Sequence, residues 1–111
     1  MAINPLKVLF VASEVEGLVK TGGLADVAKA LPQHLARQGH DVRIIMPFYK
    51  TIKRRDEATL LASRWLPTPQ DRSDISYRIH QLELDGICVY LLDCPHYFDR
   101  PQLYAENNQA Y

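Results

Sequence analysis

The stretch of this 111-residue chain with the clearest chemical character is Lys20-Thr21-Gly22-Gly23, which stands directly before an apolar run of helical spacing. Adjacent glycines let a backbone approach a ligand closely, because no Cβ stands in the way. The N–H groups and the dipole at a helix start favour an anion, above all a phosphate, and Lys20 adds a positive charge. The pattern therefore predicts a phosphate site at Lys20, Gly22 and Gly23, with a plain glycine turn beside a solvated lysine as the alternative.

Other residue patterns narrow the chemistry of this site. The glycine spacing matches neither the G-x-G-x-x-G fingerprint nor a P-loop, so it does not identify a dinucleotide or a nucleoside triphosphate. Asp26 falls in the first turn of the predicted helix, where a carboxylate either complements the helix dipole or joins the site directly. No Cys/His spacing suggests zinc, and we expect neither a metal nor a cofactor.

The elements that would position the loop form a strand–loop–helix–strand unit. Leu6–Ser13 is a nearly continuous apolar run, which predicts a strand buried on both faces. A stripe of helical spacing then predicts one helix, bent at Pro32 and ended by Gly39; its apolar residues are Leu24, Val27, Ala28, Leu31 and Leu35. Asp41–Met46 predicts the next strand. The right-handed crossover rule makes the two strands parallel, which places the Lys20 loop at the carboxyl edge of the sheet.

The second half of the chain predicts a hairpin followed by a long loop. Residues 60–66 are a candidate strand. Ile75–Leu84 pairs with Ile87–Asp93 across Asp85-Gly86, which is a two-residue hairpin signal. The apolar phase slips between Ile79 and Leu82, so we expect a bulge or irregular pairing there. The segment after Cys94 is rich in aromatic, proline and polar residues and predicts a long loop. Long loops of this kind often carry binding or catalytic residues.

Composition excludes several classes of partner. The chain has 13 Lys+Arg and 13 Asp+Glu, a formal net charge of zero, so no overall field attracts nucleic acid or an anionic membrane. Cys88 and Cys94 lie six residues apart in one apolar segment. Within a single strand they are about 20 Å apart, too far for a disulfide. Reduced thiols indicate a cytoplasmic protein.

Three segments carry a resemblance to a known family. KTGGLADV follows a strand that ends in ASEV and resembles the K-x-G-G-L signature of bacterial and plant-type glycogen (starch) synthases. The continuation ALPQHLARQGHDVRIIMPFY resembles the family's proline-containing helix, Gly-His pair and Met-Pro strand end. ICVYLLDCPHYFDRPQLY is similar to a strand and loop of the family. The resemblance spans nearly the whole chain and is weakest between about Asp56 and Asp74.

The resemblance implies a fold and an activity. The fold is GT-B, family 5-like, with two Rossmann-like domains around a cleft, and the reaction transfers glucose from ADP-glucose to the non-reducing end of an α-1,4-glucan with retention. Lys20 would pair with the donor diphosphate, and Gly22 and Gly23 would present backbone to it. Tyr104 matches a loop tyrosine that faces the sugar or acceptor. His96, in the same loop, is a candidate acceptor contact or a structural residue.

The same resemblance implies that the chain is part of a longer protein. Residues 1–111 would form a single incomplete N-terminal Rossmann-like domain, without the second, nucleotide-binding domain and its Arg/Lys pair and Glu. We expect such a fragment to be inactive alone and to self-associate through its exposed sheet. Two alternatives remain: a non-catalytic glucan- or protein-binding module with Tyr97, Phe98 and Tyr104 as its surface, and an unrelated phosphate-binding α/β domain. The sequence does not decide between ADP-glucose and UDP-glucose.

Overall fold

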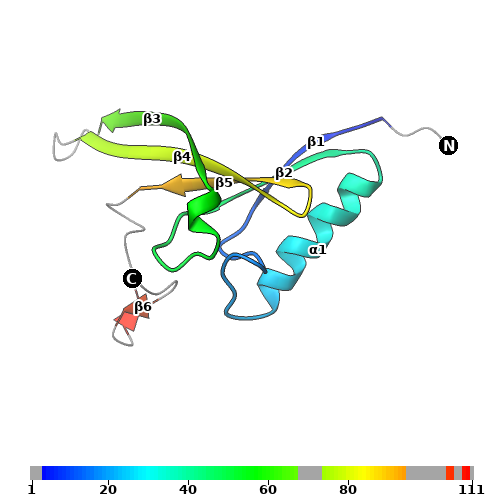
Figure 1. Ribbon diagram of the computed structural model, residues 1–111, viewed down its shortest axis with the longest axis horizontal. Helices are drawn as coiled ribbons and strands as arrows, with labels where there is room; N and C mark the ends of the chain where they lie inside the picture. Colours follow the sequence, from blue (N-terminus) through cyan, green and yellow to red (C-terminus); the bar gives the residue numbers. More distant parts are fainter. Residues whose placement is uncertain (1–3, 68–73, 95–104, 107–108, 111) are drawn as a thin grey trace.

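A mixed five-stranded sheet with the helix α1 against one face makes up the centre of the molecule (Figure 1). The computed structural model describes residues 4–67, 74–94, 105–106 and 109–110. The sheet order is β1-β2-β5-β4-β3, and a separate two-stranded ribbon is formed by β6 and β7. The elements are β1 (Lys7–Val11), α1 (Gly23–Arg37), β2 (Asp41–Pro47), the 3₁₀ turn η1 (Arg55–Glu57), β3 (Thr59–Pro67), β4 (Asp74–Leu84), β5 (Ile87–Asp93), β6 (Ala105–Glu106) and β7 (Gln109–Ala110).

The parallel part of the sheet confirms the predicted strand–loop–helix–strand unit. β1 pairs in parallel with β2, from Lys7 opposite Asp41 to Val11 opposite Ile45. β2 pairs in parallel with β5, which places the carboxyl ends of the three strands on the same side of the sheet. The loop between β1 and α1 therefore leaves the sheet at its carboxyl edge, where open α/β sheets bind ligands.

The hairpin of the second half is also confirmed, but its irregularity lies elsewhere than predicted. Asp85 and Gly86 form the turn with positive φ angles of 48° and 85°, as a type I′ hairpin turn requires. β4 and β5 pair without interruption, so the bulge expected between Ile79 and Leu82 is wrong for that pairing. The register shift is in β3, between Leu60 and Ala62, on the other side of β4. An extra residue in β3 leaves the hairpin ladder intact.

Helix α1 is one helix that contains Pro32, as predicted, and a left-handed glycine follows its C-cap. The bend expected at Pro32 stays a prediction. Gly39 has a φ of 100°, and its N–H donates to the Ala36 carbonyl at 3.0 Å. The N–H of His40 donates to the Leu35 carbonyl at 3.3 Å. These two hydrogen bonds form a Schellman motif, which satisfies carbonyl groups that the helix end would otherwise leave unpaired.

The side of α1 that packs on the sheet is its small-residue side. Ala25, Ala28 and Pro32 are the buried residues of the helix, and Ala28 belongs to the core that α1 shares with the sheet. The larger residues of the predicted apolar stripe, Leu24, Val27 and Leu31, are 48%, 52% and 41% exposed. Small side chains allow the helix backbone to approach the sheet closely. The larger ones therefore form an apolar strip on the outer side of the helix.

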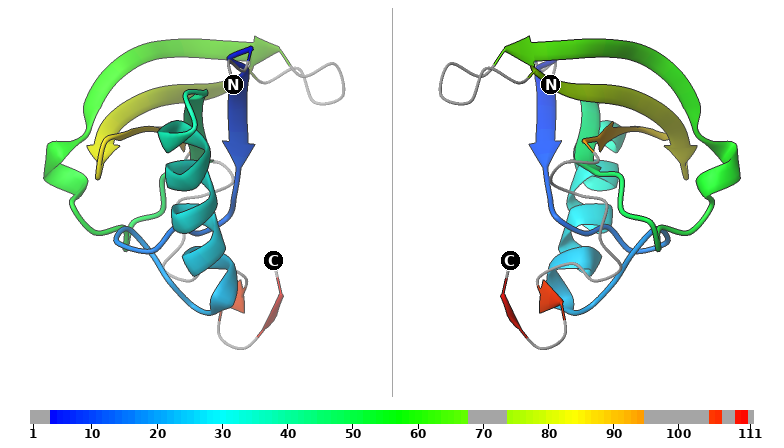
Figure 2. Two further views of the ribbon diagram at one scale, coloured as in Figure 1. Left: turned by 90° about the vertical axis from the view of Figure 1, so that its right-hand side faces the viewer. Right: turned by 90° about the vertical axis from the view of Figure 1, so that its left-hand side faces the viewer.

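The two faces of the sheet differ in what covers them. One face packs on α1 and its adjoining loops, with a core that includes Ile44, Met46, Leu82, Val89 and Leu91. Figure 2 shows α1 along this face in both side views; in the part of the chain that the structure describes, no helix covers the other face.

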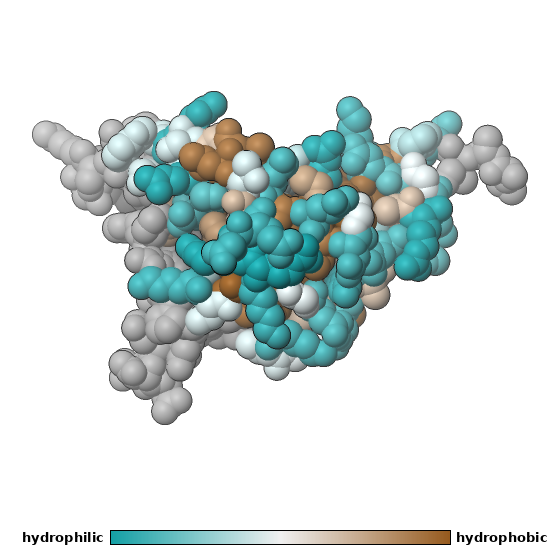
Figure 3. Space-filling model, in the orientation of Figure 1, coloured by the Kyte–Doolittle hydropathy of each residue, from teal (hydrophilic) through white to brown (hydrophobic). Residues whose placement is uncertain are grey.

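The uncovered face makes one sequence prediction wrong. Residues 6–13 were expected to form a strand buried on both faces, but Leu9 and Val11 of β1 are 55% and 76% exposed. A second covering layer is needed to bury both faces of such a strand. Over β3, the space-filling view shows a further hydrophobic patch at the upper edge of the molecule (Figure 3), where Leu60 and Leu61 are exposed.

Two further observations concern the cysteines and the helices. Cys88 and Cys94 are both free thiols, as their spacing predicts. None of the helices in the described ranges has the length and apolar character needed to cross a membrane.

Candidate functional site

The loop between β1 and α1 is anchored by a tight turn. Val15 and Val19 exchange backbone hydrogen bonds of 3.2 and 3.0 Å, and Leu18 between them is fully buried. Gly17 has a φ of 97°, and a methyl group at that position would come within 3.2 Å of Leu84 Cδ1. Glycine adopts the positive φ without strain and has no side chain that would press on Leu84. The segment that precedes Lys20 is therefore fixed against the core.

Lys20 and Asp26 form an ion pair at the surface of this loop. Lys20 Nζ donates to Asp26 Oδ1 at 2.8 Å, and the two side chains are 46% and 49% exposed. This hydrogen bond raises the pKa of Lys20, and it holds the pKa of Asp26 below its usual range. Lys20 is therefore fully protonated at neutral pH, and Asp26 is its immediate neighbour in space.

A buried carboxylate, which the sequence analysis did not identify, holds the loop from beneath. Glu14 follows β1 and is only 1% exposed. Its Oε1 accepts the N–H groups of Gly22 and Ala25, each at 3.2 Å. Its Oε2 accepts the N–H of Thr21 at 3.2 Å and also the Thr21 hydroxyl. The signal was available in the sequence: an acidic residue between apolar Ala12 and Val15, at the end of an apolar run, needs hydrogen-bond partners if it is buried.

These contacts correct part of the predicted phosphate site. The N–H of Gly22 was expected to face a ligand phosphate, but it donates to Glu14. In the described ranges, the N–H groups of Gly23 and Leu24 have no acceptor. The backbone donors available to an anion are thus one and two residues further along the chain than Gly22.

The packing of the chain itself does not explain why residues 22 and 23 are glycines. Gly22 has a φ of −169°, which is extended backbone that any residue adopts. Among the residues that the structure describes, and apart from the adjoining backbone, no atom lies within 4 Å of the position that a Cβ would take at either Gly22 or Gly23. The open space beside the two residues is therefore available to a ligand that approaches the backbone closely.

The charge around Lys20 is not favourable to an anion by itself. The carboxylates of Asp26, Glu16 and Glu14 all act on Lys20, the first through its hydrogen bond, and all raise its pKa. Lys20 thus stands beside a group of carboxylates. A diphosphate must use the remaining donor hydrogens of Lys20 or displace Asp26, so strong binding needs further cations.

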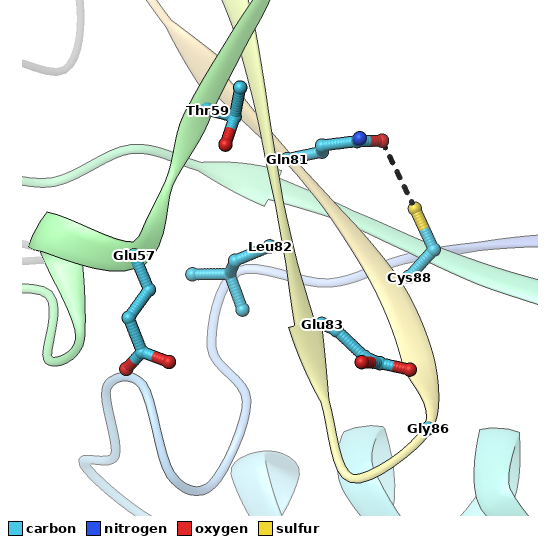
Figure 4. Close-up of a pocket in the computed structure, with 7 residues that line it drawn as sticks. All are labelled: Glu57, Thr59, Gln81, Leu82, Glu83, Gly86 and Cys88. Carbon is cyan, nitrogen blue, oxygen red and sulfur yellow. Dashed lines mark hydrogen bonds between the residues drawn. The ribbon is translucent and has the colours of Figure 1, made fainter.

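A separate hollow lies between η1 and strands β3, β4 and β5 (Figure 4). It is lined by Glu57, Thr59, Gln81, Leu82, Glu83, Gly86 and Cys88. The carboxylate of Glu57 is already bound by Arg54, at 2.6 and 2.8 Å, and Cys88 Sγ lies 3.7 Å from Gln81 Oε1. This hollow shares no residue with the Lys20 loop.

The structure brings together four of the six predicted site residues. Lys20, Gly22, Gly23 and Asp26 lie in the loop and first turn of α1. Tyr104 and His96 lie outside the described residues, as do Tyr97 and Phe98 of the alternative binding surface. Their roles stay predictions.

Comparison with known proteins gives a consistent result. Residues 7–111 match the family of starch synthase catalytic domains. A glycogen synthase of Aeromonas salmonicida is 82% identical over the whole chain, which covers 23% of that protein. A glycogen synthase of Photobacterium profundum is 57% identical over 97% of the chain and 21% of its own length.

A solved structure shows the same fold. The catalytic domain of starch synthase IV from Arabidopsis thaliana, bound to ADP and acarbose, superposes with a TM-score of 0.74 at 30% identity. The match covers 95% of this chain and 22% of that one. The likeness confirms the predicted fold class. This chain spans about a quarter of the length of the relatives that it matches.

Proposed function

Because this chain belongs to the family of starch synthase catalytic domains, we propose that it contributes the donor-phosphate loop of a glucan synthase. The enzyme transfers glucose from ADP-glucose to the non-reducing end of an α-1,4-glucan, with retention of configuration. The observation that carries the proposal is the arrangement of Lys20 beside two glycines with open space, at the start of α1 and the carboxyl edge of the sheet.

The geometry supports a defined role for the loop. Charge builds up on the diphosphate of the departing ADP as the bond to glucose breaks. Lys20 Nζ offsets that charge, and the N–H groups of Gly23 and Leu24 donate to the same oxygens. Asp26 keeps Lys20 in position before the donor arrives. ADP in the Arabidopsis structure supports an adenine nucleotide as the donor.

The proposal is tested with a hybrid protein in which the matched segment of the Aeromonas salmonicida glycogen synthase is replaced by this chain. We expect the hybrid to incorporate glucose from ADP-glucose into glycogen and to form α-linked product, which NMR of the released oligosaccharides identifies. UDP-glucose is assayed in parallel, and equal use of both donors would contradict the assignment of ADP-glucose. A folded hybrid that transfers no glucose, beside an active parent enzyme, would reject the proposed function.

Gly23 and Gly39 are glycines for different reasons, so substitution by alanine should affect donor binding at Gly23 and stability at Gly39. In the hybrid, Gly23→Ala leaves the free energy of unfolding unchanged or raises it by up to about 1 kcal/mol, because alanine favours a helix over glycine. It also raises the KM for ADP-glucose, because the new methyl group occupies the space beside the ligand.

The matched control is Gly39→Ala. It lowers the free energy of unfolding by about 1–2 kcal/mol, since Gly39 has a left-handed conformation, and it leaves the KM for the donor unchanged. Urea denaturation and steady-state kinetics measure both quantities. Equal donor KM values for Gly23→Ala and the unmodified hybrid would show that Gly23 is an ordinary turn residue.

We also propose that this chain by itself self-associates through the open side of its sheet. Leu9 and Val11 of β1 are 55% and 76% exposed, and Leu6, which precedes β1, is 60% exposed. β1 also has an unpaired edge in the described sheet. Such edges pair with further strands. We expect dimers or larger species in sedimentation velocity, and a shift toward monomer for Leu9→Glu with Val11→Lys. At a protein concentration of about 100 μM, an association with a micromolar Kd populates the dimer. A chain that is purely monomeric at that concentration would contradict this proposal.

A further inference from the structure

The least expected feature of the loop is the buried carboxylate of Glu14. Charged side chains are rarely buried unless they are paired or fully hydrogen-bonded. Glu14 is 1% exposed, and both of its oxygens accept hydrogen bonds from the loop above it. It lies three residues after the end of β1 and next to the buried Val15, so it is held close to the sheet.

The partners of Glu14 lie on both sides of the point where loop becomes helix. Oε1 accepts the N–H groups of Gly22 and Ala25, at the start of α1, where the N-cap residue Gly22 has no side chain to do so. Oε2 accepts the N–H and the hydroxyl of Thr21. Thr21 adjoins Lys20, so one side chain fixes the backbone from the residue after Lys20 to the first turn of the helix.

We propose that Glu14 is a positioning residue for the donor-phosphate loop, an inference that rests on the proposed function. By accepting the N–H groups of Thr21, Gly22 and Ala25, Glu14 turns them inward and leaves those of Gly23 and Leu24 to face the ligand. It also holds the backbone next to Lys20, so that the ammonium group lies at the same opening. Glu14 acts through these groups and does not touch the substrate.

A role limited to helix capping accounts for only part of this arrangement. Capping requires an acceptor for N–H groups of the first helical turn, which the bond from Ala25 supplies. The two bonds from Thr21 lie outside the helix and add nothing to its cap. They constrain the loop on the side of Lys20, which is where the proposed chemistry takes place.

The experiment uses the hybrid protein with three substitutions around this carboxylate. Glu14→Gln replaces one acceptor oxygen by an NH₂ group that faces N–H donors. We expect the KM for ADP-glucose to rise and kcat to fall, together lowering kcat/KM by at least about tenfold, the factor for one hydrogen bond to a charged group. The KM for glycogen stays unchanged. Thr21→Val also lowers kcat/KM for the donor. Thr21→Ser keeps the hydroxyl, so its kcat/KM stays close to that of the unmodified hybrid.

The control for the change from carboxylate to amide is Glu57→Gln. Glu57 is exposed and is paired with Arg54, away from the loop. We expect this substitution to leave both KM values unchanged. Each variant is assayed well below its thermal midpoint, measured by circular dichroism. If Glu14→Gln and Thr21→Val lower only the midpoint and leave the donor KM and kcat at the unmodified values, Glu14 is a structural cap and the proposal is wrong.

Failure of the proposed function is distinguished from failure of this inference by a measurement on the 111-residue chain itself. If the hybrid transfers no glucose, amide hydrogen exchange decides about Glu14. Glu14→Gln should accelerate exchange at Thr21 and Gly22 by at least about tenfold, with exchange in β2 and β5 unchanged. Unaltered exchange at Thr21 and Gly22 would overturn the positioning role independently of any activity.

Discussion

Replacing Lys20 by alanine in the hybrid protein is expected to lower kcat by about 10²–10³-fold, the typical effect of removing one donor that stabilises developing negative charge. Lys20 is the cation at the opening of the loop, and its pKa is raised by Asp26, so it carries a full charge when the diphosphate departs. The fold changes little, because an exposed ion pair contributes little to stability.

The matched control for this experiment is Lys7→Ala. Lys7 is also an exposed lysine, but it lies at the amino end of β1. The Lys20 loop follows the carboxyl end of the same strand. Removal of the same charge at Lys7 should leave kcat and both KM values unchanged. Glucose incorporation at saturating ADP-glucose measures the difference. Near-normal turnover of Lys20→Ala under these conditions would show that Lys20 is only a surface lysine.

The second large effect concerns the 111-residue chain on its own. We expect it to transfer no glucose and to bind ADP-glucose with a dissociation constant no tighter than about 1 mM, or roughly 4 kcal/mol. The structure supplies the reason: Lys20 stands beside the carboxylates of Asp26, Glu16 and Glu14. Water also has free access to an exposed loop, and water weakens every charge interaction there.

Isothermal titration calorimetry with ADP-glucose and a glucan-incorporation assay measure these two quantities on the purified chain. The hybrid protein, assayed in parallel, is the positive control. Micromolar binding by the chain alone, or turnover above background, would mean that these residues hold a complete site. The inference that strong binding needs cations besides Lys20 would then be wrong.

Local patterns determined the elements and their order. The glycine at position 39, the Asp85-Gly86 pair and the apolar run that includes residues 7–11 each act through backbone preferences or periodicity over a few residues. Such signals do not depend on the rest of the molecule. The predicted strand–loop–helix–strand unit and the hairpin are therefore present in the structure with nearly the predicted bounds.

Burial, in contrast, depended on what packs against each element. The predicted stripe indicated an amphipathic helix, but of its residues Leu24, Val27 and Leu31 are exposed. The buried side of α1 has Ala28 of that stripe together with Ala25, which lies outside it. β1 is apolar on both sides, yet Leu9 and Val11 are exposed. An apolar residue shows only that burial is favourable; it does not show which partner covers it.

For the site, the sequence by itself determined the chemistry, and the tertiary structure decided the geometry. Lys20, the two glycines and the helix start indicated a phosphate loop, because charge and backbone freedom are properties of the residues themselves. Only the fold placed Glu14 beneath the loop, eight residues before Gly22, where it accepts that residue's N–H. A hydrogen bond between residues so far apart depends on the path of the chain between them. The path of this chain is set by the turn from Val15 to Val19 and its burial against the core.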